Sequence, residues 1–192
     1  PPNVHALVGE VEPYRAPVKE GLERFNSLEW PDHLSGFAAH VQRAGELLMQ
    51  AFNEFLSAPN QSNPAMGGYR AMGLNTRATE AIYPVSAMLP PVSRFFLNPD
   101  QRDDEELLAR LSEADASREN VGVMHAANGS DERGGFSMYV PEYYDGEKVP
   151  LIVAMHGGSG HGRSFLWTWL RTVRSRGALL ISPSSRAVSY TH

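Results

Sequence analysis

The stretch that decides the fold is Leu151-Ile-Val-Ala-Met-His-Gly-Gly-Ser-Gly-His-Gly-Arg-Ser164. It begins with five apolar residues, as expected of a strand with both faces covered in a parallel sheet. The loop that follows has four glycines in six residues, so its backbone can turn sharply and present bare N–H groups. Apolar residues then recur at helical spacing until Gly177, which is placed to end a helix. A strand, a glycine loop and a helix start together bind negative charge, either a stable phosphate or a transient oxyanion.

The flanking segments predict three more strands. Val121–Ala127 and Gly135–Val140 are typical of two strands joined by a turn over residues 128–131. Within the second segment, large apolar residues alternate with Ser137 and Tyr139, as in a half-buried strand. Ala178–Pro183 is another short buried strand after the helix. The predicted order is hairpin, strand, glycine loop, helix, strand.

His156-Gly-Gly-Ser-Gly160 resembles the H-G-G-G-type loop of the α/β-hydrolase family, which lies between the third strand and the first helix of that fold. The predicted order of elements is also the opening order of that family's sheet. The amino-acid sequences of residues 149–158 and 180–185 most resemble those of the esterase, phospholipase and polyester-depolymerase branches of the family. The resemblance implies an α/β fold in which residues 119–192 form the first half of the hydrolase sheet. An all-helical region, residues 1–118, precedes it.

The resemblance also implies a reaction and a site. Gly158 and Ser159 occupy the positions that would donate backbone N–H groups to the oxyanion of an acyl-transfer reaction. His156, Gly157 and Gly160 would support the loop, with His156 as a structural anchor. The implied activity is hydrolysis of a small-molecule or lipid-like carboxylic ester through a serine, without a cofactor.

The chain departs from the family pattern in one respect. The nucleophile of such enzymes lies in G-x-S-x-G on the next strand-to-helix turn, and no such pattern occurs in these residues. The nucleophile, acid and base are therefore expected beyond His192, in a longer hydrolase of which this chain is a fragment. The chain alone is expected to be an inactive hydrolase.

Three other interpretations stay open. Gly157–Ser164 fits the phosphate-loop pattern except that Arg163 replaces its lysine, and the next strand ends without the aspartate that would hold magnesium. The loop could also be only a tight connection between a strand and a helix. Alternatively, the protein is a non-catalytic helical interaction or dimerisation module that carries a half-sheet.

The N-terminal part has strong helix signals. Apolar residues step by three or four between Pro31 and Pro59, which predicts an amphipathic helix. Asn60–Gly73 is typical of a loop, and a second helix is expected from about Asn75 to Tyr83. Asn98-Pro99 resembles the start of a third helix, with an N-cap and a proline at the first position.

These helices have three candidate roles. They could pack for stability alone. They could cap an active site, with an apolar entrance lined by Met66, Tyr69, Met72 and Met88. They could instead form a homo-oligomer by burying Phe37, Phe52 and Phe55 across a partner helix.

Composition limits the class of protein. A 42% hydrophobic and 20% charged chain is that of a soluble globular protein. A net charge of −5 without a basic cluster speaks against nucleic acid, and no apolar stretch is long enough to span a membrane. The absence of cysteine excludes disulfides and thiolate metal sites, and the histidines lack ligand spacing, so no metal site is predicted. The compartment is left open: the cytoplasm is favoured, or secretion if a leader preceded Pro1.

Overall fold

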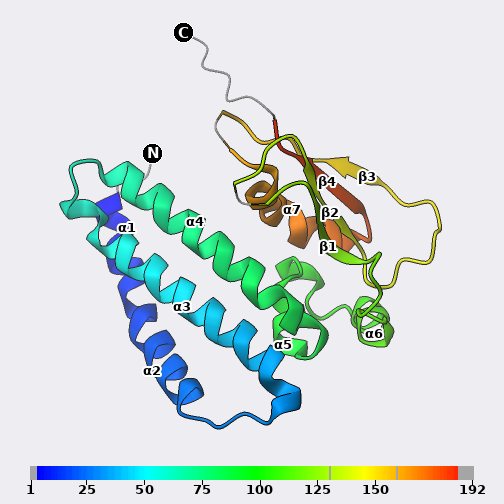
Figure 1. Cartoon of the computed structure of the whole chain (residues 1–192), viewed down its shortest axis with the longest axis horizontal. Coiled ribbons are helices and arrows are strands. Elements are labelled where there is room, and N and C mark those ends of the chain that lie inside the picture. Colours follow the sequence, from blue (N-terminus) through cyan, green and yellow to red (C-terminus); the bar gives the residue numbers. More distant parts are fainter. Residues whose placement is uncertain (1–3, 130, 159, 186–192) are drawn as a thin grey trace. The chain divides into compact units, whose positions relative to one another are not determined.

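The structure, a computed structural model, describes residues 4–129, 131–158 and 160–185 (Figure 1). Helices come first, and a mixed four-stranded sheet with a flanking helix follows, which confirms the predicted α/β class. The chain forms two compact units, one up to Val85 and one from Ser86 onward. The division near residue 118 that the sequence predicts marks the change from helices to strands. The boundary between the two compact units lies earlier in the chain, between Val85 and Ser86.

The first unit is helical. Its helices are α1 (Val4–Val11), α2 (Arg15–Asn26), α3 (Ser35–Ser57) and α4 (Pro64–Ile82), with short 3-10 turns between them. Helix α3 confirms the amphipathic helix predicted between Pro31 and Pro59. Its buried stripe includes Leu47, Ala51 and Phe52, and it packs along α4 (Figure 1).

The predicted loop Asn60–Gly73 is wrong over most of its length. Helix α4 begins at Pro64, and the Asn63 side chain caps it by accepting a hydrogen bond from the Met66 N–H at 3.3 Å. Gly67 is a packing residue within this helix, because a Cβ there would lie 2.7 Å from the Ala58 Cβ. Gly67 therefore allows a close approach to Ala58 and does not break the helix.

Phe37 and Phe52, two of the three phenylalanines predicted to join a partner helix, pack within the unit, whereas Phe55 lines a cavity of about 260 Å³. The Phe37 ring lies edge-on to Trp30, with the ring centroids 5.5 Å apart, and Phe25 completes the cluster. Phe52 is buried. Met66, Tyr69 and Met72 are exposed on α4. A homo-oligomer through this unit stays a prediction.

The second unit contains the sheet. Its helices are α5 (Pro90–Phe95), α6 (Glu105–Glu113) and α7 (Gly162–Arg176), and its strands are β1 (Gly122–Ala126), β2 (Phe136–Val140), β3 (Leu151–Val153) and β4 (Leu179–Pro183). The third predicted helix starts later than expected. Asn98-Pro99 opens only a 3-10 turn, and α6 begins at Glu105, where the Asp104 side chain accepts from the Leu107 N–H.

The strand order is β1-β2-β4-β3. β1 and β2 form the predicted antiparallel hairpin, β2 is antiparallel to β4, and β3 is parallel to β4. Helix α7 connects the two parallel strands, and it ends at Gly177, which takes the left-handed conformation with φ of 62° as its sequence position predicts. β1 and β3 are the two edge strands of the sheet described here.

The two faces of this sheet differ sharply. One face, called here the covered face, contains Tyr139 and Leu180, both fully buried where α7 packs on β2 and β4. The polar Ser137 is also buried on this face, because its hydroxyl bonds His125 and Asn128. The alternation in β2 thus marks a half-buried strand, but its serine and tyrosine side is the buried one.

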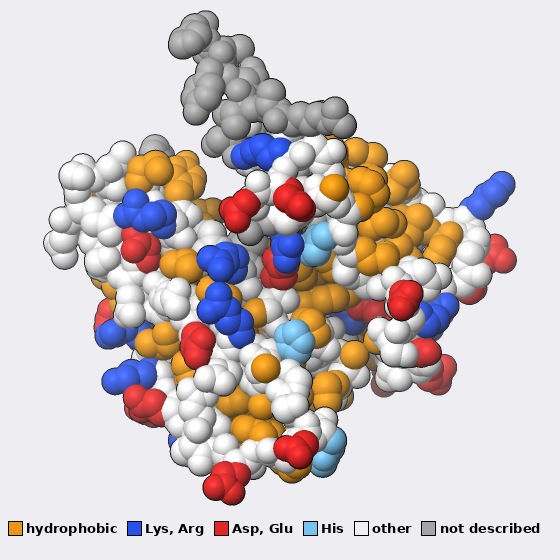
Figure 2. Space-filling model, in the orientation of Figure 1, with side chains coloured by type: hydrophobic (Ala, Val, Ile, Leu, Met, Phe, Trp, Pro, Cys, Tyr) orange, Lys and Arg blue, Asp and Glu red, His pale blue; other side chains and the backbone are white. Residues whose placement is uncertain are grey.

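The opposite face, called here the open face, is apolar. The pairing register puts Met124, Met138, Ile181 and Val153 in one row across it. Leu151, Val153 and Met155 on the β3 side are 61%, 55% and 74% exposed. The expectation that both faces of β3 are covered is therefore wrong for the described chain. Figure 2 shows apolar surface in the region where Figure 1 draws β2, β4 and β3.

A buried ion pair fastens α7 to the rest of the second unit. Arg174 Nε donates to Glu142 Oε1 at 3.1 Å, and its other nitrogens donate to the backbone and side-chain oxygens of Ser93 on α5. The Tyr139 hydroxyl donates to the second Glu142 oxygen at 2.8 Å. Both charges are buried, and these hydrogen bonds offset the cost of removing them from water.

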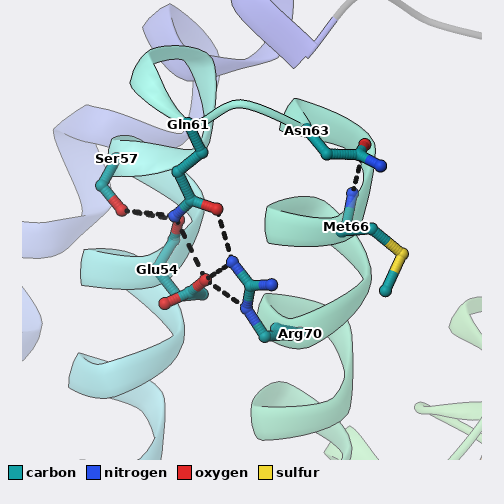
Figure 3. A network of polar contacts seen from close by, with 6 residues as sticks. All are labelled: Glu54, Ser57, Gln61, Asn63, Met66 and Arg70. Carbon is teal, nitrogen blue, oxygen red and sulfur yellow. Dashed lines mark hydrogen bonds and ion pairs between the residues drawn. The ribbon is translucent and has the colours of Figure 1, made fainter.

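A polar network closes the α3–α4 turn of the helical unit (Figure 3). Arg70 Nε donates to Glu54 Oε1 at 2.7 Å, and Arg70 also donates to the Gln61 side chain. Gln61 in turn donates to Glu54 and Ser57. The hydrogen bond from Arg70, followed by that from Gln61, holds the pKa of Glu54 below its ordinary value of 4.5.

This shift predicts a pH dependence. A carboxylate whose pKa is lowered in the folded state contributes stability above its unfolded pKa, and that stability is lost as the pH falls through the folded pKa. Glu54→Gln is therefore expected to reduce the fall in unfolding free energy of the helical unit below pH 4.5, measured by urea titration. The effect should be small because the pair is partly exposed. The exposed Glu20→Gln is the control, and an equal acid dependence in both variants would contradict the assignment.

Candidate functional site

The glycine loop leaves the sheet at the carboxyl ends of its two parallel strands. The Ala154 N–H donates to Ile181 O at 2.9 Å, and the Ser182 hydroxyl donates to Ala154 O at 3.0 Å. These two bonds extend the pairing of β3 and β4 by one residue. The residues from His156 onward then lie just beyond the strands, which is where α/β proteins place their ligands.

The loop itself contains a tight turn with free donors. The Gly160 N–H donates to Gly157 O at 3.0 Å, so these two residues close the turn. Gly158 is exposed and has a φ of 52°, in the left-handed region that favours glycine. Within the described part of the chain, no hydrogen bond occupies the Gly157 or Gly158 N–H. Ser159, the other predicted donor, lies outside the described residues.

The start of α7 differs in this respect from the loop. The Gly162 N–H donates to the Ser184 hydroxyl at 2.8 Å, and the Arg163 N–H donates to His161 Nδ1 at 3.1 Å. The Phe165 N–H bonds His161 O. These partners leave few free helix N-terminal donors for a phosphate, which disfavours the phosphate-loop hypothesis for Gly157–Ser164.

His156 lies between two loops. Its Nε2 accepts from the Ser185 N–H at 3.4 Å, so the neutral ring carries its proton on Nδ1. Nδ1 is buried and has no hydrogen-bond partner among the described residues. The contact with Ser185 ties the glycine loop to the segment after β4, and it supports the interpretation of His156 as an anchor.

Sequence reasoning missed the residues that surround this loop. Arg133 Nη1 donates to Gly160 O at 3.2 Å, and His161 Nε2 bonds the backbone oxygen of Glu132 at 2.7 Å. Ser184 caps α7 and is 5% exposed, so it is a buried structural hydroxyl. These contacts join segments more than twenty residues apart, and no local spacing signals them.

The described residues bring no complete catalytic constellation to the loop. No group of three or more histidine, aspartate or glutamate side chains among them could hold a metal ion. The cavities described in this unit, of about 210 and 430 Å³, lie beside α5, α6 and the end of α7, and glycine-loop residues do not line them. Met88 lines the larger of them, whereas Met66, Tyr69 and Met72 belong to the helical unit. The proposed apolar entrance is not assembled within either unit.

Comparison with known proteins finds no matching family model, no matching curated protein and no matching solved structure. None of the helices in the described ranges has both the length and the apolar character needed to cross a bilayer.

The position of the loop depends on Gly162. A Cβ at this residue would lie 2.4 Å from Ser182 O and 2.7 Å from Pro183 O, so α7 can start this close to β4 only with glycine. Gly162→Ala is expected to lower the free energy of unfolding by about 2 kcal/mol, the usual cost of overpacking, measured by urea titration. Gly157→Ala is the control, because a Cβ there meets nothing within 4 Å, and its change should stay within about 0.5 kcal/mol. Equal effects of the two variants would show that this close approach does not constrain the fold.

Proposed function

We propose that the glycine loop after β3 is the oxyanion-binding half of a serine ester hydrolase of the α/β-hydrolase type. The observation that carries the proposal is the unoccupied Gly158 N–H beyond a parallel strand. The neighbouring donors at Gly160, Gly162 and Arg163 are already bonded within the protein. The Gly157 and Gly158 N–H groups are therefore both available to a group from outside, and the resemblance places Gly158 at the donor position.

The chemistry is acyl transfer. A serine oxygen adds to the ester carbonyl, and the carbonyl oxygen becomes a negatively charged tetrahedral oxyanion. The Gly158 N–H would donate to that oxygen, and its loop is preorganised because the Gly157–Gly160 turn fixes it. One such donor is worth about 3 kcal/mol of barrier. The alcohol then leaves, and water releases the acid. The substrate class is a small-molecule or lipid-like carboxylic ester.

We expect the nucleophile to come from a segment outside the described chain. The open face and the free edge of β3 support this expectation. Connections between parallel strands are right-handed almost without exception, and α7 carries the chain from β3 to β4 over the covered face. A connection in the opposite direction, from β4 past β3, must therefore cross the open face. A helix there would cover the exposed Val153 and Met155, and its strand would pair with the free edge of β3.

That arrangement would place a second loop beside the glycine loop. The chain after β3 turns toward the covered face, and the chain after a strand next to β3 would turn toward the open face. Ligands of α/β proteins bind in the crevice between two such diverging loops. A serine at the end of the added strand would therefore face the Gly158 N–H across the crevice.

The proposal predicts what the longer gene product contains and does. The codons after His192 are expected to encode a strand, a G-x-S-x-G turn and a helix. A fluorophosphonate reagent, which labels activated serines, should modify that serine in the longer protein and should leave the 192-residue chain unlabelled. Absence of the serine turn from the reading frame, or labelling of the short chain, would overturn the proposal.

The role of the Gly158 N–H needs its own variant. Proline would remove the donor, but its φ near −65° is incompatible with the observed 52°. Replacement of the Gly158 amide by a backbone ester removes the donor and keeps glycine's freedom. It should lower kcat for a nitrophenyl ester by about 100-fold or more. The same replacement at Gly146, an exposed glycine in the turn before β3 with φ of 100°, is the control and should leave kcat unchanged. Unchanged kcat in the Gly158 variant would remove this N–H from the oxyanion site.

A further inference from the structure

The described residues of the connection between β1 and β2 are hydrogen-bonded to one another beside the candidate site. The Gly129 N–H donates to Glu132 Oε2 at 2.7 Å, and the Glu132 N–H donates back to Gly129 O at 3.1 Å. At its far end, a Cβ on Gly135 would lie 2.0 Å from Ala127 O. The two ends of the loop therefore pack too closely to admit any side chain at Gly135.

This loop is also fixed to the segment after β4. The Gly134 N–H donates to Ser184 O at 3.2 Å, and the Ser184 N–H donates to Gly135 O at 2.9 Å. The Ser184 side chain, in turn, accepts from the Gly162 N–H at the start of α7. The β1–β2 loop, the end of β4 and the start of α7 thus form one hydrogen-bonded frame.

Two contacts connect this frame to the glycine loop. Arg133 donates to Gly160 O, the carbonyl at the end of the turn that contains Gly158. His161 has Nδ1 occupied as an acceptor for the Arg163 N–H, so its proton is on Nε2 and donates to Glu132 O. One imidazole therefore caps α7 and ties the cap to the β1–β2 loop.

We propose that Arg133 and His161 are positioning residues that hold the glycine loop against the β1–β2 loop and so fix the direction of the Gly158 N–H. This inference rests on the proposed function, since the direction of that N–H matters only if an oxyanion meets it. Neither side chain touches the reacting atoms. Both act through Gly160 and Glu132, whose backbone oxygens they bond.

The variants are matched to separate positioning from folding. His161→Asn keeps an N-cap acceptor for α7, because asparagine is a favoured cap, but it is too short to reach Glu132 O. Arg133→Gln removes the guanidinium, and Arg133→Lys keeps one charged donor for Gly160 O. Lys148→Gln, an exposed residue in the turn before β3, is the control for loss of a positive charge.

The readout is the backbone amide spectrum of the ¹⁵N-labelled chain. Arg133→Gln and His161→Asn should shift the Gly158 and Gly160 amide resonances and speed hydrogen exchange at Gly160, whose N–H bond closes the turn, by about tenfold. Amides in β1 and β2 should not move, Arg133→Lys should restore the wild-type pattern, and Lys148→Gln should change nothing at the loop. Unchanged loop resonances in both first variants, or no recovery with lysine, would overturn the proposal.

Activity separates this inference from the proposed function. In the longer protein, Arg133→Gln should lower kcat for a nitrophenyl ester with little change in KM, because the oxyanion exists only in the transition state. A protein without any ester hydrolysis but with the expected resonance shifts would refute the hydrolase and leave only a structural brace. A hydrolase whose kcat does not respond to Arg133→Gln would refute the positioning role.

Discussion

The closeness of α7 to β4 is the constraint on which the second unit depends. Gly162 lets the helix begin against the carbonyls of Ser182 and Pro183, and the buried pair of Arg174 with Glu142 fastens its other end. With both ends held, α7 lies firmly on one face of the sheet. On that face the β2 and β4 side chains are buried, even the polar Ser137. The glycine loop is the short segment that must connect β3 to this fixed helix start.

The same constraint explains the asymmetry of the sheet. A parallel strand pair is stable when helices cover both of its faces, and here α7 covers one of them. Leu151, Val153 and Met155 stay exposed on the other side. Burial of one large apolar side chain stabilises a protein by about 2 kcal/mol. Covering the exposed row on the open face would therefore add considerably to the stability of the unit. In the proposed hydrolase a further helix would cover this face, as the right-handedness of parallel connections requires.

Local patterns predict much of this fold. The helix between Pro31 and Pro59, the β1–β2 hairpin and the stop at Gly177 follow from periodicity and turn chemistry, and the structure confirms all three. Local sequence patterns predict the structure wrongly where a contact between residues far apart in the chain determines it. Gly67 resembles a helix breaker until Ala58 is seen against it, and the buried side of β2 is set by α7.

The candidate site shows the same division between local and distant signals. The glycine spacing predicts the turn around Gly158, whose N–H has no partner among the described residues, and its role as an oxyanion donor stays a prediction. Arg133 and Glu132 come from a loop more than twenty residues earlier, so only the folded chain brings them to the glycine loop.

The most direct measurement is a crystal structure of the longer protein after reaction with a phosphonate ester, whose phosphonyl oxygen imitates the oxyanion. This oxygen is expected about 2.7–3.1 Å from the Gly158 nitrogen, with the phosphorus bonded to a serine on the strand beside β3. A phosphonyl oxygen held by other donors, with the Gly158 N–H directed away from it, would contradict the account.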